Sequence, residues 1–374
     1  MSRSASLTLQ RRLTRPVKVG SVVVGGDAPI SVQSMTNTDT RDIASTAGQI
    51  AELAEAGADL VRVSCPDKEA AQCVAQLVKG SPVPLIADIH FDHKLALMAL
   101  DGGIDCLRIN PGNIGSRQRV AEVVQAASLR RVPIRIGVNA GSLDKDLLAK
   151  YGEPCADAMV ESGLHHIRIL EDLNYQEIKI SLKASSVAMT VEAYRKLAKQ
   201  VDYPLHLGIT EAGGMIPGSV KSAIGLGLLL SEGIGDTLRV SLSANPVEEV
   251  RVGFEILKTL GLRTRGVNII SCPTCSRQEF AVIDVVAQLE KRLAHIRESV
   301  NLSIIGCIVN GPGEAKECHV GLVGGGGENL LYINGKPQQK IADNKVISRL
   351  VEEVELAAKK IREQQEIENS TKNH

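Results

Sequence analysis

Three cysteines have positions that suit metal binding. Cys272 and Cys275 form a CxxC pair directly after a predicted strand, and Cys307 ends another predicted strand. Three thiolates in such positions could hold zinc or an iron–sulfur cluster, and the spacing alone does not separate the two. The fourth ligand would be either Cys318, which completes four thiolates, or Glu314, which a Gly/Pro turn would bring back toward Cys307. A thioredoxin-like dithiol is the weaker interpretation, because it leaves Cys307 without a role.

The other cysteines indicate packing and a reducing compartment. Eight cysteines in 374 residues are too few for a disulfide scaffold, so we expect free thiols and a cytoplasmic protein. A buried free cysteine behaves as a small apolar side chain. We therefore assign the four cysteines outside the ligand candidates to packing, namely Cys65, Cys73, Cys106 and Cys155.

Cations gather at the ends of predicted parallel strands. Five strand ends carry an Arg or a Lys, although the whole chain has 43 basic and 43 acidic residues and a formal net charge of zero. A local concentration of Arg and Lys predicts a polyanionic ligand, and planar guanidinium groups suit phosphate or diphosphate oxygens. The alternative is that some of these side chains point outward and form structural ion pairs with the helices. The residues are the cations Arg62, Arg108, Arg135, Lys183 and Arg239, accompanied by Asn110, Asn139, Ser241 and Ser243.

Few acidic residues accompany these cations. Glu211 lies beside Gly213 and Gly214 after the predicted seventh strand, and it is the best candidate for proton transfer. Asp88 and His90 are two residues apart, so they share one face of a strand. These two residues could supply acid/base chemistry or half of a metal site, or they could form a packed, hydrogen-bonded pair.

Eight short β-branched segments alternate with Ala/Leu-rich segments of helical periodicity. This alternation predicts an α/β fold, a (β/α)8 TIM barrel over about residues 20–262, with its active site at the carboxyl ends of the strands. We interpret Met159–Leu173 as a helix rather than a hidden strand at Ile167–Leu170, since this keeps eight strands. The predicted strands are Pro29–Gln33, Leu60–Ser64, Pro84–Asp88, Cys106–Asn110, Pro133–Val138, Glu177–Leu182, Pro204–Ile209 and Thr237–Ser241.

The pattern changes after residue 262, which predicts a smaller α+β domain over residues 263–363. All the metal-ligand candidates fall in this second domain. Residues 1–19 are expected to form an N-terminal arm, and the polar residues 364–374 a frayed tail. The expected elements of the domain are strands at Val267–Ser271 and Asn301–Val309, a helix at Ala281–Ile296, a Gly-rich turn, a hairpin around Asn334-Gly335 and a closing helix from Lys345.

The composition supports this fold class and excludes other functions. Hydrophobic residues make up 44% of the chain, with no Trp, three Phe and five Tyr, so the core must be aliphatic, as in parallel α/β proteins. A neutral chain without a long basic block lacks the global attraction that binding to nucleic acid or a membrane surface requires. No apolar run approaches the roughly 18 residues of a membrane span, so none is expected.

The strand-end residues and the cysteines belong to longer motifs. Together, in this order and over nearly the whole chain apart from arm and tail, these motifs resemble the 4-hydroxy-3-methylbut-2-enyl diphosphate synthase family (IspG/GcpE) of the methylerythritol phosphate pathway, in its short two-domain bacterial form. The motifs are Ser34-Met35-Thr36, Arg108-Ile109-Asn110-Pro111-Gly112-Asn113, Arg135-Ile136-Gly137-Val138-Asn139, the run from His206 to Gly214, the CxxC pair and Asn310-Gly311-Pro312-Gly313-Glu314.

The resemblance implies an oxidoreductase of isoprenoid biosynthesis. Its reaction is reductive ring opening and dehydration of 2-C-methyl-D-erythritol 2,4-cyclodiphosphate to (E)-4-hydroxy-3-methylbut-2-enyl diphosphate, with two electrons from flavodoxin or ferredoxin. By this resemblance Arg108, Arg135, Asn139 and Lys183, with Ser241 or Ser243, would bind the diphosphate, and Glu211 and Glu314 would be catalytic. The strand-end positions add Arg62, Asn110 and Arg239 as candidate substrate-binding residues. The resemblance also implies a homodimer, in which each cluster domain caps the partner's barrel. It further implies one [4Fe-4S] cluster per subunit, held by Cys272, Cys275, Cys307 and Glu314, which excludes Cys318.

Two other functions are compatible with the residues. The first is a pterin-binding barrel of the dihydropteroate-synthase type with a structural zinc module, which a colourless, zinc-containing protein would favour. The second is a non-catalytic redox sensor whose cluster signals oxidation. The cations at the barrel mouth argue against the sensor, because a sensor needs no diphosphate pocket.

Overall fold

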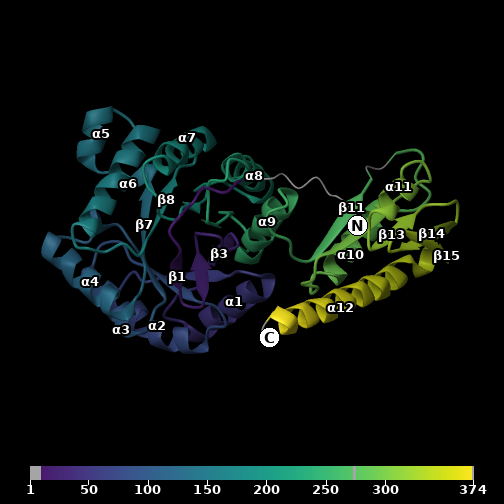
Figure 1. The fold of residues 1–374 in the computed structure, drawn as a ribbon, viewed down its shortest axis with the longest axis horizontal. Coiled ribbons are helices and arrows are strands. Elements are labelled where there is room, and N and C mark those ends of the chain that lie inside the picture. The colour runs from purple at the N-terminus through teal and green to yellow at the C-terminus, as the bar shows by residue number, and fades with distance from the viewer. Residues whose placement is uncertain (1–9, 273–274, 373–374) are drawn as a thin grey trace. The chain divides into compact units, whose positions relative to one another are not determined.

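The computed structural model describes residues 10–272 and 275–372 (Figure 1). Its described residues form two compact units, one ending at Arg263 and the other beginning at Thr264. The first part of the predicted arm, the two inner residues of the CxxC pair and the last two residues of the tail lie outside the described ranges. Within these ranges, no helix is long and apolar enough to cross a membrane.

The first unit is a closed barrel of eight parallel strands in its described residues, which confirms the predicted (β/α)8 fold. The strands pair with their neighbours in the order β8-β7-β6-β5-β4-β3-β10-β9, which gives seven strand pairs. A parallel bridge between Ile180 and Leu205 joins β8 to β9 and closes the barrel. The strands are β3 (Ser31–Met35), β4 (Leu60–Ser64), β5 (Leu85–Asp88), β6 (Cys106–Ile109), β7 (Ile134–Asn139), β8 (Ile178–Lys183), β9 (His206–Leu207) and β10 (Thr237–Leu238).

Helices surround the barrel strands, as Figure 1 shows. Asp67, Asp92 and Asn245 lie in loops after strands and accept hydrogen bonds from backbone N–H groups in the first turns of α2, α3 and α9. The predicted helix at Met159–Leu173 is confirmed by α6, whereas α5 was not predicted. The helices are α1 (Ile43–Ala56), α2 (Lys68–Gly80), α3 (His93–Asp101), α4 (Arg117–Arg130), α5 (Lys145–Tyr151), α6 (Ala156–Glu171), α7 (Val187–Ala198), α8 (Met215–Ser231) and α9 (Pro246–Thr259).

A short hairpin of β1 (Val17–Val19) and β2 (Val22–Val24) covers the end of the barrel at which the strands begin. Val19 and Val24 pack against Leu60, Ile86 and Cys106, which stand at the starts of β4, β5 and β6. The sequence did not predict this hairpin, since strands of three residues show too little alternation to be recognised. These apolar contacts close the barrel at the end where its strands begin. The polar residues lie toward the opposite end, where the strands finish.

Alternation along the barrel strands separates an apolar layer from a polar interior. In β7, Ile134 and Ile136 belong to the large core formed with the helices, whereas Arg135 between them contacts Ser181 of β8. The period of two in a strand places Arg135 and Gly137 on the opposite face from the isoleucines. Most TIM barrels fill the interior with branched apolar side chains, so a cationic interior marks this barrel for ligand binding.

The second unit contains a five-stranded mixed sheet in its described residues. Helices α10 and α12 share an apolar core with the sheet, and α11 packs with Val323 and Tyr332 in a separate small cluster. The elements are β11 (Val267–Ser271), α10 (Val282–Arg292), β12 (Val300–Ile305), α11 (Gly311–Lys316), β13 (Val320–Val323), β14 (Glu328–Ile333), β15 (Lys336–Ala342) and α12 (Val346–Lys372).

Several expectations for this unit can be compared with its elements. The hairpin at Asn334-Gly335 is confirmed, and both residues have positive φ angles, 49° and 74°, as a tight two-residue turn requires. Strand β12 ends at Ile305 instead of Val309, and the expected Gly-rich turn contains helix α11. The prediction of a frayed tail was wrong for residues 364–372, because helix α12 continues to Lys372.

Candidate active site

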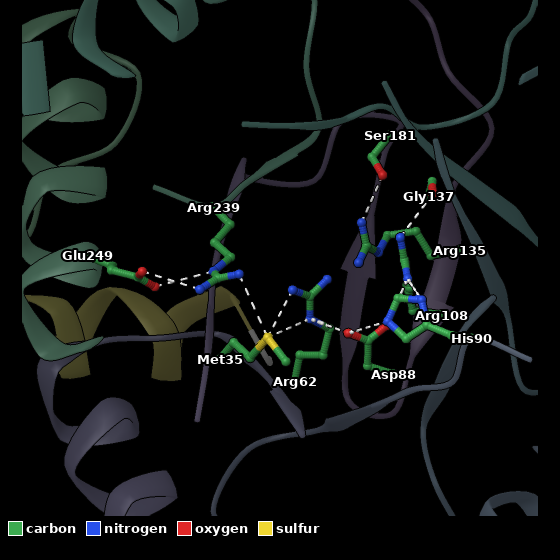
Figure 2. Close-up of polar contacts among 10 residues, drawn as sticks. All are labelled: Met35, Arg62, Asp88, His90, Arg108, Arg135, Gly137, Ser181, Arg239 and Glu249. Atoms are coloured by element: carbon green, nitrogen blue, oxygen red, sulfur yellow. Dashed lines mark hydrogen bonds and ion pairs between the residues drawn. The ribbon is translucent and has the colours of Figure 1, made fainter. Parts of the chain in front are cut away.

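Five cations lie close together inside the barrel: Arg62, Arg108, Arg135, Lys183 and Arg239, hereafter the barrel cations. The first four stand on β4, β6, β7 and β8, and Arg239 directly follows β10. The charges that act on Lys183 are those of the other four, so the group is one electrostatic unit. Four of the five appear in Figure 2, where they converge on the barrel interior. The structure therefore brings together the cations that the strand ends predicted.

Asp88, from β5, is the carboxylate in the middle of this group (Figure 2). Arg108 donates through Nη1 to Asp88 Oδ1 over 3.2 Å, and Arg62 Nε lies 3.6 Å from Oδ2. His90 Nε2 is 3.7 Å from Oδ2. Burial opposes ionisation of Asp88, but Arg62, His90 and Arg108 outweigh it and hold the pKa of the carboxyl well below its usual range. Asp88 therefore acts as a fixed counter-charge to Arg62 and Arg108, with the imidazole of His90 beside it.

The barrel cations retain hydrogen-bond donors that the protein does not satisfy. Arg135 Nη1 donates to Ser181 Oγ over 2.8 Å, while its Nε and Nη2 are buried without a partner among the described residues. Burial, then Arg62 and Arg108, lower the pKa of Arg135 well below its ordinary value. Burial and then Arg135 do the same to the pKa of Lys183. Buried unpaired donors are costly, and a multivalent anion would satisfy them.

Glu249 is a candidate site residue that the sequence did not predict. It stands on α9, yet its Oε2 and Oε1 accept hydrogen bonds from Arg239 Nε and Nη2, each over 3.2 Å (Figure 2). It also accepts from the backbone N–H of Leu242 and from Ser34 Oγ. Arg239 is thus paired with a helix residue, and it also contacts Met35 of β3. A search limited to strand ends could not find this carboxylate.

Gly137 and Asn110 position Arg108. Arg108 Nη2 donates to the carbonyl oxygen of Gly137 over 2.9 Å, and the N–H of Gly137 donates to Asn110 Oδ1 over 2.9 Å. A Cβ at position 137 would lie 2.4 Å from Arg108 Nε, so a larger residue would force this guanidinium to shift. Asn110, predicted to bind substrate, is therefore already engaged in holding β6 and β7 in place.

The remaining predicted barrel residues are more accessible. Asn139 and Ser241 are half-buried, and Ser243 is exposed. Glu211 is exposed in the loop after β9 and has a φ of 52°, a left-handed conformation that is uncommon for a residue with a side chain. The N–H of Ser243 donates to the carbonyl oxygen of Gly213 over 2.9 Å, which ties this loop to the one after β10. These residues lie at the same end of the barrel as the barrel cations.

In the second unit, two of the candidate cysteines follow neighbouring parallel strands. Cys272 comes directly after β11 and Cys307 follows β12, which pairs with β11 in parallel. The N–H of Gly306 donates to Cys272 Sγ over 3.3 Å. The backbone N–H of Val309 holds the pKa of Cys307 below its ordinary value. Backbone N–H groups directed at thiol sulfurs suit thiolates that bind a metal or a cluster.

The other ligand candidates occupy different surroundings. Cys275 is exposed, and Cys318 is buried with 4% of its surface accessible. Glu314 is exposed on α11, one turn after Asn310, whose carbonyl oxygen accepts from the Glu314 N–H. In residues 10–272 and 275–372, no three His, Cys, Asp or Glu side chains lie close enough together to hold a metal ion. In their chemistry, the three thiols and the carboxylate nevertheless fit the donor set of an iron–sulfur cluster.

Comparisons with known proteins agree on one family. The model of the GcpE TIM-barrel domain matches residues 14–254, and that of the GcpE protein C-terminal domain matches residues 268–356. A protein of Magnetococcus marinus named 4-hydroxy-3-methylbut-2-en-1-yl diphosphate synthase (flavodoxin) is 73% identical, over 97% of this chain and 98% of its own. Proteins of the same name from Geobacter sulfurreducens and Ectopseudomonas mendocina are 60% and 58% identical, over 91% of this chain and 97% and 92% of theirs.

The likeness to solved structures is much weaker. A dihydropteroate synthase of Xanthomonas albilineans matches with a TM-score of 0.47 and 15% identity, covering 66% of this chain and 98% of that one. Such a likeness has no bearing on function. The matches to relatives confirm the predicted resemblance, and they do not favour the pterin-binding alternative.

Proposed function

The chain belongs to the GcpE family, and on this premise we propose that it is a 4-hydroxy-3-methylbut-2-en-1-yl diphosphate synthase that uses flavodoxin as its electron donor. The reaction is the reductive ring opening and dehydration of 2-C-methyl-D-erythritol 2,4-cyclodiphosphate to 4-hydroxy-3-methylbut-2-enyl diphosphate, in isoprenoid biosynthesis. It consumes two electrons and releases water. The printed name of the relatives supports flavodoxin rather than ferredoxin.

The observation that carries this proposal is the group of barrel cations with unsatisfied donors. Arg135 has two buried nitrogens without a partner in the described chain, and burial among cations lowers the pKa of Lys183. A diphosphate would accept hydrogen bonds from both residues and, as an opposite charge, would raise the pKa of Lys183 toward its ordinary value. We propose that the barrel cations bind the diphosphate, with Asn139, Ser241 and Ser243 near its outer oxygens and Asn110 supporting Arg108.

We propose that Cys272, Cys275, Cys307 and Glu314 hold one [4Fe-4S] cluster per subunit. Such a cluster supplies electrons one at a time. Support comes from the positions of Cys272 and Cys307 after neighbouring strands and from the backbone N–H groups directed at their sulfurs. Cys318 is the less suitable fourth ligand, because it is buried.

Glu211 is the proposed proton-transfer residue. Its carboxyl group is exposed at the carboxyl end of the barrel, so it can exchange protons with water as well as with a bound substrate. The left-handed backbone at φ 52° marks a local conformation that sets the direction of the side chain. Asp88 is unsuitable for this role, since its pKa is held far below neutrality. A homodimer and a cytoplasmic location complete the proposal, on the family resemblance and on the free thiols.

The test is anaerobic turnover of purified protein with 2-C-methyl-D-erythritol 2,4-cyclodiphosphate and reduced flavodoxin. We expect product formation, about four irons and four sulfides per chain, and loss of turnover but not of iron in Glu211→Gln. The matched control is Glu192→Gln, an exposed glutamate on α7 that pairs with Lys196, which should keep wild-type turnover. A fully active Glu211→Gln variant would refute its role in proton transfer. A colourless zinc protein without turnover would refute the function itself.

A further inference from the structure

Met35 stands between two of the barrel cations. It ends β3, and β3 lies between β10 and β4 in the sheet, so its neighbours are Arg239 and Arg62. Arg62 donates to Met35 Sδ from Nε over 3.1 Å and from Nη2 over 2.9 Å, and Arg239 Nη1 lies 3.7 Å from the same sulfur. Figure 2 shows the thioether bridging the two guanidinium groups. Met35 is also the centre of the Ser34-Met35-Thr36 motif, for which the proposed function has no role.

A thioether is an unusual partner for buried guanidinium groups. Sulfur in methionine is a weak acceptor, whereas buried arginines usually face carboxylates or carbonyl oxygens. Two other barrel cations do so: Arg108 bonds Asp88 and the Gly137 carbonyl, and Arg239 bonds both oxygens of Glu249. Arg62 has only a carboxylate oxygen at 3.6 Å besides the sulfur, in the part of the chain that the structure describes. Arg62 is therefore held in place by the weakest acceptor in the group.

The electrostatics of Arg62 agree with this geometry. Burial, opposed by Asp88 and assisted by Arg239 and Arg108, lowers the pKa of Arg62 to about 10, so the side chain remains charged at neutral pH but is poorly compensated. A cation in this situation gains more from an incoming anion than one already paired with a carboxylate. An oxygen acceptor at position 35 would compensate the charge of Arg62 before any ligand binds. It would then compete with the ligand for the hydrogen bonds of this guanidinium group.

We infer that Met35 is a positioning residue for the diphosphate. Its sulfur fixes the spacing of Arg62 and Arg239 without consuming their strongest hydrogen bonds, and the two guanidinium groups exchange the thioether for phosphate oxygens when the ligand enters. This inference rests on the proposed function, because it assigns a role within the same anion site.

The test compares Met35→Gln with Met35→Leu in the anaerobically purified holoprotein, with inorganic pyrophosphate as the probe in titration calorimetry. Glutamine has nearly the length of methionine but presents an amide oxygen, so it should weaken pyrophosphate binding at least about tenfold. Leucine keeps the volume but has no acceptor, so it removes the contact that positions the two guanidinium groups without adding a competitor for the ligand, and binding should weaken by only about threefold. The control is Met215→Gln on α8, a partly exposed position, which should bind as the wild type does.

The turnover assay distinguishes a loss of positioning from a general loss of structure. In Met35→Gln, KM for the cyclodiphosphate should rise about tenfold while kcat stays within about twofold, with an unchanged thermal midpoint. Equal pyrophosphate affinities in Met35→Gln and the wild type would overturn the inference, as would an equal loss in Met35→Leu and Met35→Gln. If the wild type binds no pyrophosphate, the proposed function of the barrel fails as well, so the two failures are distinguishable.

Discussion

The barrel cations and the candidate cluster cysteines differ in what holds their side chains. Arg62, Arg108 and Arg239 stand on or directly after strands, and each contacts a side chain from another element of the same unit. Cys272, Cys275 and Cys307 follow strands β11 and β12, and backbone N–H groups contact the sulfurs of Cys272 and Cys307. The barrel cations are fixed by strand register and ion pairs, whereas the cysteines are candidate ligands on loops.

This difference has a physical cause. The register of parallel strands places Arg108 beside Asp88 on one side and beside Arg135 on the other, so like charges are neighbours before any ligand binds. A rigid barrel keeps these like charges close together. Their mutual electrostatic repulsion favours the binding of an anion between them. Thiols on loops can instead adopt their final arrangement around the ion that they bind, because metal binding and local folding are coupled.

The largest effect is expected at the cysteines. Cys307→Ser replaces a soft thiolate by a hydroxyl, a poor ligand for iron, so we expect loss of cluster iron and at least a thousandfold loss of turnover. Iron and sulfide analysis with the turnover assay measures both. Cys318→Ser is the matched control in the same unit and should keep its iron. Equal iron contents in Cys307→Ser and the wild type would remove Cys307 from the ligand set.

The next effect concerns the ion pairs that hold the barrel cations. Glu249→Gln leaves Arg239 without its buried counter-charge, so the free energy of unfolding of the barrel should fall by about 3 kcal/mol in urea denaturation. Glu232→Gln is the matched control, because it breaks a pair at the surface in which Nε and Nη2 of Arg195 likewise donate to a glutamate. That loss should remain below about 1 kcal/mol. Equal losses of unfolding free energy in the two variants would mean that the Arg239–Glu249 pair stabilises the barrel no more than a surface ion pair does.

A smaller effect is expected from pH. His166 on α6 accepts a hydrogen bond from the Gly112 N–H over 3.2 Å, and burial is the main reason why its pKa is lowered to about 4. Asp144 opposes this shift and His165 adds to it. Because the unfolded chain takes up a proton near pH 6.5 and the folded chain does so only near 4, stability is lost as the pH falls through this interval.

His166→Gln tests this prediction. Between pH 7.5 and 5, the wild type should lose about 2 kcal/mol more unfolding free energy than the variant, which keeps an acceptor for Gly112 but does not titrate. His165→Gln, at an exposed position on the same helix, is the control. An identical pH dependence in His166→Gln and the wild type would show that the turn after β6 does not depend on a neutral imidazole.

The sequence predicted the barrel well, because each strand is a β-branched run and each connection has helical periodicity. The pleat of a strand also placed residues two positions apart on one face, as with Asp88 and His90. The hairpin of β1 and β2 was missed because its strands have three residues each. Helix α11 was missed because its segment begins Gly311-Pro312-Gly313, a composition typical of turns.

The sequence predicted only those residues of the candidate site that are charged or polar and stand at strand ends. Met35 and Glu249 were not assigned roles, since one is uncharged and the other stands on a helix, and only the fold brings them to Arg239. Gly137 belongs to one of the sequence motifs, but only the structure shows that its missing side chain leaves space for Arg108. Such roles depend on three-dimensional proximity, which a linear motif does not contain.

The smallest expected effect tests how closely the barrel cations are packed. In Gly137→Ala the new Cβ would lie 2.4 Å from Arg108 Nε and 2.8 Å from Nη2, so the guanidinium must shift and its bond to the residue 137 carbonyl must weaken. Pyrophosphate affinity should fall about tenfold, which is about 1.4 kcal/mol of binding free energy. Gly141→Ala, with no atom within 4 Å of the added carbon, is the matched control. If both variants bind pyrophosphate like the wild type, the barrel cations adjust to displacement, and the contrast with the cysteine loops is smaller than the register of the strands indicates.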